Sequence, residues 1–151
     1  RRQRQMCIRD RRVDILKLIS ELRNEFNTTL LYITHDLATL RYIAETGRLA
    51  VMYLGEIVEM SSISTIVENP MHPYTQLLIS ALPEPDPRIT RAKQLPKLRS
   101  LDIPSISNPP PGCRFHTRCP YYIDGTCNRV KPRLVEVAQN HYVACHLYAR
   151  K

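Results

Sequence analysis

Apolar residues recur at helical spacing between residues 13 and 26, close to the i, i+3, i+4, i+7 pattern of an amphipathic helix. The apolar positions are Val13, Ile15, Leu16, Leu18, Ile19, Leu22 and Phe26. The next segment, TTLLYIT at 28–34, is short, rich in β-branched and aromatic residues, and apolar at consecutive positions. That pattern is typical of a strand buried on both faces of a parallel sheet. We therefore predict a helix followed by a buried strand.

A second helix is expected over LATLRYIAE, where Asp36 or Thr34 can provide the N-cap. After Gly47 the apolar positions alternate, and RLAVMYL and EIVEMS read as two strands that meet at Gly55. Helix, buried strand, turn and helix together predict a fragment of a layered α/β domain.

Two short helices are predicted at 62–68 and 74–82, on either side of the proline-framed segment NPMHP. The segment 83–111 carries eight of the twelve prolines and few large apolar side chains. It is expected to be an extended linker and not part of a core.

The last segment, 112–151, has too little apolar content for a core of its own and needs a staple such as a metal. Its stretch LVEVAQNHYVACHLY predicts a hairpin with Gln139 and Asn140 near the turn. Four cysteines follow with five, seven and seventeen intervening residues, and the hairpin would return the last toward the other three. They are Cys113, Cys119, Cys127 and Cys145.

Four thiolates can close a tetrahedral zinc site or hold a [4Fe–4S] cluster. The spacing does not choose between these, although the lack of a CxxC pair counts against the commonest zinc folds. Reduced or disulfide-linked cysteines are the remaining alternative. His116, His141 and His146 could substitute as ligands, but four cysteines suffice, so these histidines are expected at the surface or behind the ligands.

The formal net charge of +8 is concentrated at the N-terminus, where residues 1–12 hold six arginines and one aspartate. Such an arm can bind a phosphate backbone, but a solvated or foreign segment is the expected reading. No run approaches the roughly 18 apolar residues of a membrane span, and no signal peptide is recognisable. A cytoplasmic chain is therefore expected, in which clustered cysteines more often bind metal than form disulfides.

His35 follows the predicted buried strand and precedes a helix N-terminus. In open α/β sheets ligands bind at that edge, although a histidine there can equally finish a turn. The segment LLYITHDLATLRYIAETGRLAVMYLGEIVE resembles the last part of an ABC-transporter nucleotide-binding domain, with THDL as the switch-histidine motif. NPMHPYTQLLISALP resembles the hallmark of oligopeptide and dipeptide importer ATPases, and the resemblance covers about residues 13–148.

This resemblance implies an α/β fold: the C-terminal part of an ABC-type (P-loop NTPase) domain, followed by a small, irregular, cysteine-rich, metal-stapled tail. It implies that His35 contacts the ATP γ-phosphate and the attacking water, with Mg²⁺ as the accompanying ion, and that Asp36 caps the helix. A C-x5-C-x7-C tail resembles those that carry a [4Fe–4S] cluster, with a structural role. In this reading His72 caps a helix, although contact with a partner is the alternative.

The sequence departs from the family in several places. The GxxxxGK[ST] phosphate loop, the signature motif and the Walker B strand are absent, and Gly47 stands where the family has an acidic residue. Residues 1–12 match nothing in the family. The expected organisation is an unmatched segment, the end of the ATPase domain, the NPxHPYT helix with its linker, and the cysteine-rich region, at 1–12, 13–68, 69–111 and 112–151.

The function expected from the resemblance is that of a partial ATP-hydrolysing subunit of an ABC importer for dipeptides or oligopeptides, inactive as this fragment alone. It would lie peripherally on the cytoplasmic face of the membrane. Its partners would be a second ATPase subunit, the transmembrane permeases and, indirectly, a solute-binding protein, with no nucleic acid. The solute remains open among peptides, oligosaccharides and nickel. The alternative is a free-standing binding module stapled by a metal on four cysteines, with nucleic acid as one ligand class.

Overall fold

The computed structural model describes residues 2–40, 47–82 and 96–149. The chain divides into two compact units, Arg1–Gly47 and Arg48–Lys151.

Unit 1 begins with the long helix α1 (Arg2–Glu25), which contains the predicted helix and starts eleven residues before it. Arginine and glutamine favour helix, so the polar sequence ahead of Val13 continues the same element. The helix ends where Asn27 adopts a left-handed conformation with φ 48°. There the Thr28 N–H donates to the Arg23 carbonyl at 3.1 Å, a common way to satisfy the last carbonyls of a helix.

The predicted buried strand at 28–34 is wrong for this structure, because the segment has no regular secondary structure. Leu31 and Ile33 are 86% and 87% exposed. A strand exists only through hydrogen bonds to neighbouring strands, and the described part of unit 1 contains none. Of the predicted second helix, the structure shows the short 3-10 helix η1 (Leu37–Thr39), and most of the remainder lies outside the described residues.

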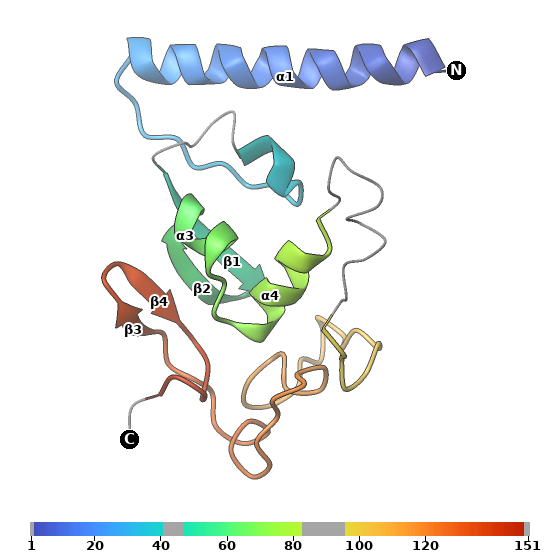
Figure 1. The fold of residues 1–151 in the computed structure, drawn as a ribbon, viewed down its shortest axis with the longest axis vertical. Helices are drawn as coiled ribbons and strands as arrows, with labels where there is room; N and C mark the ends of the chain where they lie inside the picture. The colour runs from blue at the N-terminus through green and yellow to red at the C-terminus, as the bar shows by residue number, and fades with distance from the viewer. Residues whose placement is uncertain (1, 41–46, 83–95, 150–151) are drawn as a thin grey trace. The chain divides into compact units, whose positions relative to one another are not determined.

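Unit 2 contains one four-stranded sheet in the order β1-β2-β4-β3, with every neighbouring pair antiparallel. Figure 1 shows α3 and α4 beside the β1–β2 hairpin and the β3–β4 hairpin on the other side of β2. The elements are β1 (Arg48–Tyr53), β2 (Glu56–Ser62), α3 (Ile63–Glu68), α4 (Pro73–Ser80), β3 (Val135–Ala138) and β4 (His141–Val143).

Both hairpins and both short helices of unit 2 were predicted, but not that the hairpins join in one sheet. The described sheet is antiparallel throughout; the strand predicted for a parallel sheet was the segment 28–34, which is not part of it. The turn of the second hairpin is where the sequence placed it, with Asn140 at φ 57°. In the first hairpin Leu54 and Gly55 both have positive φ, 45° and 80°, as a two-residue turn between twisted strands requires.

Glu59 on β2 is a fully buried carboxylate that binds three donors from two distant segments. Its Oε1 accepts from the Met71 N–H at 2.8 Å and from His141 Nε2 at 2.7 Å, and its Oε2 accepts from the His72 N–H at 2.9 Å. A register shift between Val51 and Met52 places Val58 and Glu59 inside in succession, which breaks the alternation along β2. The carboxylate therefore joins β2, the NPMHP turn and β4.

His72 caps α4, as the sequence predicted. Its Nδ1 accepts a hydrogen bond from the Tyr74 N–H at 3.1 Å, and Pro73 occupies the first turn. Only 1% of the residue is exposed. Burial lowers the pKa of His72 to about 4, against the opposing effect of the Glu59 charge. A neutral imidazole is what this cap requires, since the Nδ1 lone pair must stay free to accept.

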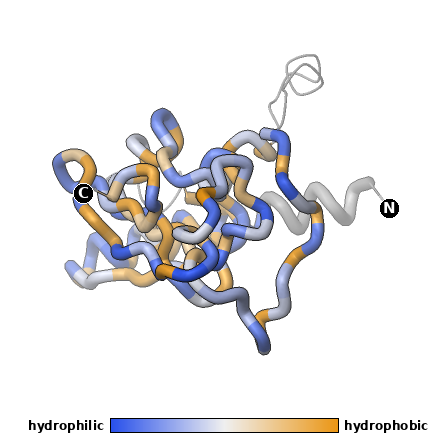
Figure 2. The backbone as a smooth tube through the Cα atoms, turned by 90° about the horizontal axis from the view of Figure 1, so that it is seen from below, coloured by the Kyte–Doolittle hydropathy of each residue, from blue (hydrophilic) through white to orange (hydrophobic). Residues whose placement is uncertain are grey.

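Figure 2 shows that apolar and polar stretches alternate closely along the described chain. No helix in the described ranges is long and apolar enough to cross a membrane.

Replacing Glu59 by Gln is expected to destabilise unit 2 by about 2 to 4 kcal/mol, because the new NH₂ group would face buried N–H donors. Glu56→Gln on the same strand is the matched control. Glu56 pairs with Arg114 and Lys131 and is 19% exposed at its side chain, so about 1 kcal/mol or less is expected. Hydrogen exchange of the β2 and β4 amides in the full chain measures both. Equal losses would show that the Glu59 contacts do not stabilise the fold.

Candidate functional site

His35 lies in unit 1 at a bend between the irregular segment 28–34 and η1, and its side chain is exposed. The turn around it is formed locally. The Thr34 hydroxyl accepts from the Asp36 N–H at 2.9 Å, and the Thr39 hydroxyl donates to the Asp36 carbonyl at 2.6 Å. The imidazole is thus open to a ligand, but the described residues of unit 1 provide no phosphate-binding loop around it.

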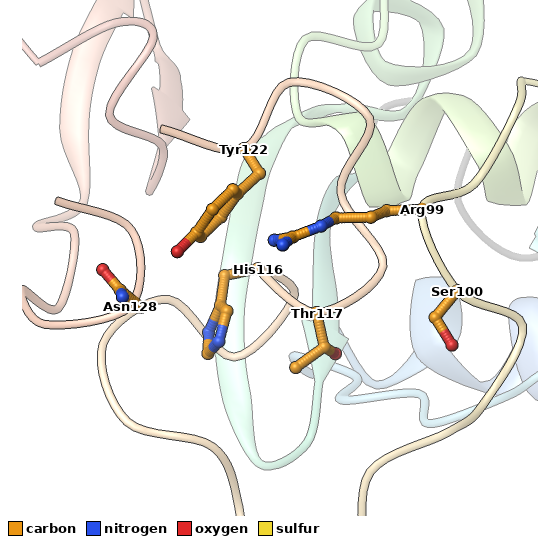
Figure 3. Close-up of a pocket in the computed structure, with 6 residues that line it drawn as sticks. All are labelled: Arg99, Ser100, His116, Thr117, Tyr122 and Asn128. Atoms are coloured by element: carbon orange, nitrogen blue, oxygen red, sulfur yellow. The ribbon is translucent and has the colours of Figure 1, made fainter. Parts of the chain in front are cut away.

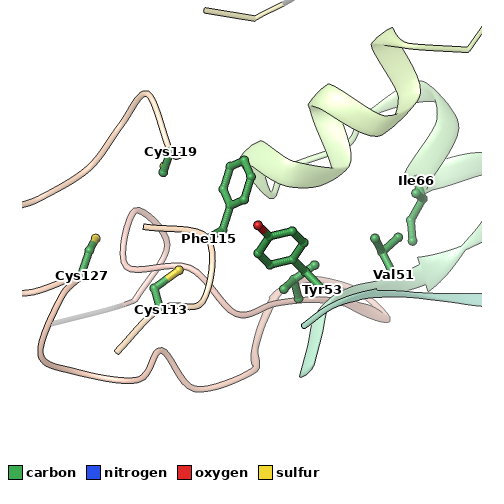
Figure 4. Packing of buried hydrophobic residues seen from close by; sticks show 8 residues of the cluster. Val51, Tyr53, Ile66, Cys113, Phe115, Cys119 and Cys127 are labelled. Atoms are coloured by element: carbon green, nitrogen blue, oxygen red, sulfur yellow. The ribbon is translucent and has the colours of Figure 1, made fainter. Parts of the chain in front are cut away.

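The four C-terminal cysteines all lie in unit 2 as free, buried thiols. Each residue is 7–9% exposed. Three of them belong to the same core as the first hairpin, together with Phe115, which is 1% exposed. The Phe115 ring lies 5.3 Å from Tyr53 in an edge-on arrangement, and Figure 4 shows the two rings side by side with cysteine loops next to Phe115. The region was predicted to lack a core, and the structure shows that it shares one.

Gly112 closes the cysteine-containing loops. The neighbouring Cys113 N–H donates to the Cys127 carbonyl at 2.8 Å, which brings the two chain segments into contact. Gly112 has φ 67°, and a Cβ there would collide with the Cys127 carbonyl and with the backbone of Asn128 and Arg129. Only glycine fits, for reasons of both conformation and space.

Burial raises the pKa of the Cys113 thiol to about 11 and that of Cys145 to about 12, and it raises the pKa of Cys119 as well. The Cys145 pKa is raised further by the charge that the other three sulfurs would carry as thiolates, so the four groups lie near one another. Since metal ligands are thiolates, a bound group would have to supply the compensating positive charge.

Backbone N–H groups oppose this effect. For Cys113, Cys119 and Cys145 the backbone two residues further along hydrogen-bonds to the sulfur and lowers the pKa. The donors are Phe115, Tyr121 and Leu147. Cys127 Sγ accepts from the Ile123 N–H at 3.5 Å. Each sulfur therefore has a backbone donor, which is a favourable environment for a thiolate.

Within the described ranges, no group of three or more His, Cys, Asp or Glu side chains is arranged to hold a metal ion. The predicted metal-stapled tail is therefore not confirmed as a preformed metal site. Burial favours the protonated thiol at Cys113, Cys119 and Cys145, whereas metal ligands are thiolates.

The three nearby histidines have other partners. His116 Nδ1 lies 2.8 Å from the Cys113 carbonyl, and His146 Nε2 lies 2.8 Å from the Val130 carbonyl. His141 is 2% exposed and bonds to Glu59, so it does not lie at the surface. The sequence analysis did not recognise Glu59, which lies in a predicted strand, as the buried partner of this histidine.

A cavity of about 340 Å³ opens beside the cysteine loops. Figure 3 shows the side chains that line it: Arg99, Ser100, His116, Thr117, Tyr122 and Asn128. The Arg99 guanidinium lies 3.9 Å from the centre of the Tyr122 ring, a cation–π contact. The Arg99 N–H also donates to the Arg118 carbonyl at 3.1 Å. Arg99, which lies within the predicted linker 83–111, is thus fixed to the cysteine region.

Residues 58–127 match the family described as the C-terminal region of oligopeptide/dipeptide transporters. The matched residues include NPMHPYT, and the resemblance to the oligopeptide and dipeptide importer ATPases is confirmed. The described part is a mixed helix and strand structure consistent with the C-terminal part of an ABC ATPase.

Particular relatives extend the similarity to most of the chain. The oligopeptide transport ATP-binding protein AppF of Bacillus subtilis is 42% identical over 89% of this chain and 40% of its own length. The Brucella ovis protein BOV_A0347, whose name describes peptide import and ATP binding, is 44% identical over 87% of the chain and 39% of its own length. The chain thus spans about 40% of the length of the curated relatives it matches.

Gly112→Ala is expected to destabilise the cysteine region by about 2 kcal/mol or more, because the strain of a positive φ and the collision with the backbone both raise the energy of the folded state. Gly125→Ala is the matched control, since Gly125 also has positive φ, 71°, but nothing lies within 4 Å of its Cβ position. About 1 kcal/mol is expected there. Alkylation rates of the four buried cysteines, read by mass spectrometry, report the opening of this region. Similar alkylation rates in both variants would show that the collision of a Cβ at position 112 with the nearby backbone does not destabilise this region.

Proposed function

We propose that the chain is part of an ATP-binding subunit that energises peptide uptake by an ABC importer. The observation that carries the proposal is the similarity to peptide-importer ATP-binding proteins over 87–89% of the chain. In this proposal the complete subunit binds ATP with Mg²⁺, dimerises with a second ATPase subunit and acts on transmembrane permeases from the cytoplasmic face of the membrane.

His35 is the residue of this chain that we assign to the hydrolytic reaction. Its exposed imidazole at a turn is free to approach the γ-phosphate and the attacking water, and to hold that water in line. Phosphoryl transfer depends on such positioning and on charge stabilisation more than on covalent chemistry by the protein. Leu31 and Ile33 support the same proposal, since both are exposed here and are apolar enough to be covered by further sheet strands.

In a full-length subunit assembled with its permease, His35→Ala is expected to lower ATP turnover about 100-fold or more while ATP affinity changes little, because the lost contact forms mainly in the transition state. Asp36→Asn is the control, since asparagine caps a helix as well as aspartate does. Turnover by hydrolysis assay and affinity by calorimetry test this. Unchanged hydrolysis in the alanine variant would remove His35 from the reaction.

The four cysteines are the second proposed site, as ligands of a [4Fe–4S] cluster. The donor set fits: four buried thiols, each with a backbone N–H directed at its sulfur, and no acidic ligand among them. A single zinc ion with bonds of about 2.3 Å needs sulfurs about 3.8 Å apart. A cluster binds each sulfur to a different iron and tolerates wider spacing.

A bound cluster would supply the positive charge that four buried thiolates need, and covalent links between loops that otherwise meet through Phe115 and Gly112. The cysteines would then hold unit 2 together. The proposed role is structural.

Anaerobic purification of the full chain is expected to give about four irons per chain and a broad absorption band at about 400 nm. Cys127→Ser should lose most of the iron, because one ligand is missing. Cys7→Ser changes the one cysteine of the sequence outside this set of four, and this variant should retain the iron. Stoichiometric zinc in a colourless protein would refute the cluster and leave a zinc staple in its place.

A further inference from the structure

Two hydroxyl side chains connect the segment before His35 with η1 after it. The Tyr32 hydroxyl lies 3.4 Å from the Thr39 hydroxyl, and both residues are half-buried. Leu31 and Ile33, on either side of Tyr32, are 86% and 87% exposed, whereas Tyr32 turns toward η1. The bond between the two hydroxyls closes a short loop of the chain that contains His35.

The direction of this bond follows from the number of hydrogens available. A threonine hydroxyl has one hydrogen, and that of Thr39 is donated to the Asp36 carbonyl at 2.6 Å. Its oxygen must therefore accept from the Tyr32 hydroxyl. The three groups form a chain of hydrogen bonds in which the Thr39 hydroxyl both donates and accepts, and serine is the closest replacement that can do the same.

Side-chain hydroxyls hold both backbone polar groups of Asp36, the residue that follows His35. The Asp36 N–H belongs to the peptide bond with His35 and donates to the Thr34 hydroxyl at 2.9 Å. The Asp36 carbonyl accepts from the Thr39 hydroxyl. No strand lies in the described part of unit 1 to hold this backbone. The direction in which the imidazole leaves the chain therefore depends on these side-chain bonds.

We propose that Thr39 and Tyr32 are positioning residues for His35, an inference that rests on the proposed role of His35 in ATP hydrolysis. Both hydroxyls act through the backbone and not on ATP itself. They restrict the turn that carries the imidazole, so that the ring meets the attacking water in line with the γ-phosphate. Such restriction matters for the rate, because a displacement of about 1 Å can cost about 100-fold in turnover.

A purely structural role of the Thr39 hydroxyl would give a different result. The Thr39 N–H also donates to the Asp36 carbonyl, at 3.2 Å, so the turn of η1 keeps a backbone hydrogen bond when the hydroxyl is removed. Loss of the hydroxyl is therefore expected to loosen the turn without unfolding it. If the hydroxyl served stability alone, the folded enzyme would keep its full turnover.

The test uses the full-length subunit assembled with its permease. Thr39→Val keeps the shape of the side chain and is expected to lower ATP turnover about tenfold at unchanged ATP affinity, whereas Thr39→Ser should stay within about threefold of the parent. Thr28→Val makes the same change at an exposed threonine of unit 1 and should leave turnover unchanged. Full turnover in Thr39→Val, or a serine variant as slow as the valine variant, would overturn the proposal.

Double variants separate this proposal from the assignment of His35 itself. Tyr32→Phe should lower turnover about threefold, and adding it to Thr39→Val should cause no further loss, because the phenol acts through Thr39. In the same way, Thr39→Val should have no effect in a His35→Ala background. Equal losses with and without His35, or additive losses for Tyr32 and Thr39, would refute the positioning role alone. Unchanged hydrolysis in His35→Ala would refute both proposals.

Discussion

The arrangement of unit 2 depends on one buried charge. A carboxylate removed from water costs several kcal/mol unless hydrogen bonds replace its hydration, and Glu59 finds these donors on the NPMHP turn and on β4. The turn must therefore present two successive N–H groups, which the proline-framed segment does immediately before α4. His72 completes the arrangement, since its backbone binds Glu59 while its neutral side chain caps α4.

Local elements were predictable because their signals are local. Alternating apolar residues predicted β1 and β2, prolines predicted the ends of α3 and α4, and Gln139 and Asn140 predicted the turn of the second hairpin. The register shift near Val51 could not be predicted, because it depends on both strands at once. The strand expected at 28–34 is absent for a related reason. The apolar pattern indicates which residues can form a strand, but a strand forms only where neighbouring strands pair with it.

For the candidate sites as well, local signals could be predicted and contacts between distant segments could not. Cysteine spacing predicted that four sulfurs would gather, and all four lie buried together. It did not predict the role of Phe115, which joins these loops to the first hairpin through Tyr53 and Tyr74. One aromatic residue among polar neighbours carries no periodic signal. The bond between His141 and Glu59 likewise joins distant segments of the chain.

The bond between Glu59 and His141 joins residues separated by 82 positions. A ribosome adding about 5 to 20 residues per second needs roughly 4 to 16 s to cover that distance. Until His141 has been made, the carboxylate lacks its third donor and β2 lacks β4. During that time the growing chain exposes an unpaired strand edge next to an incompletely satisfied charge.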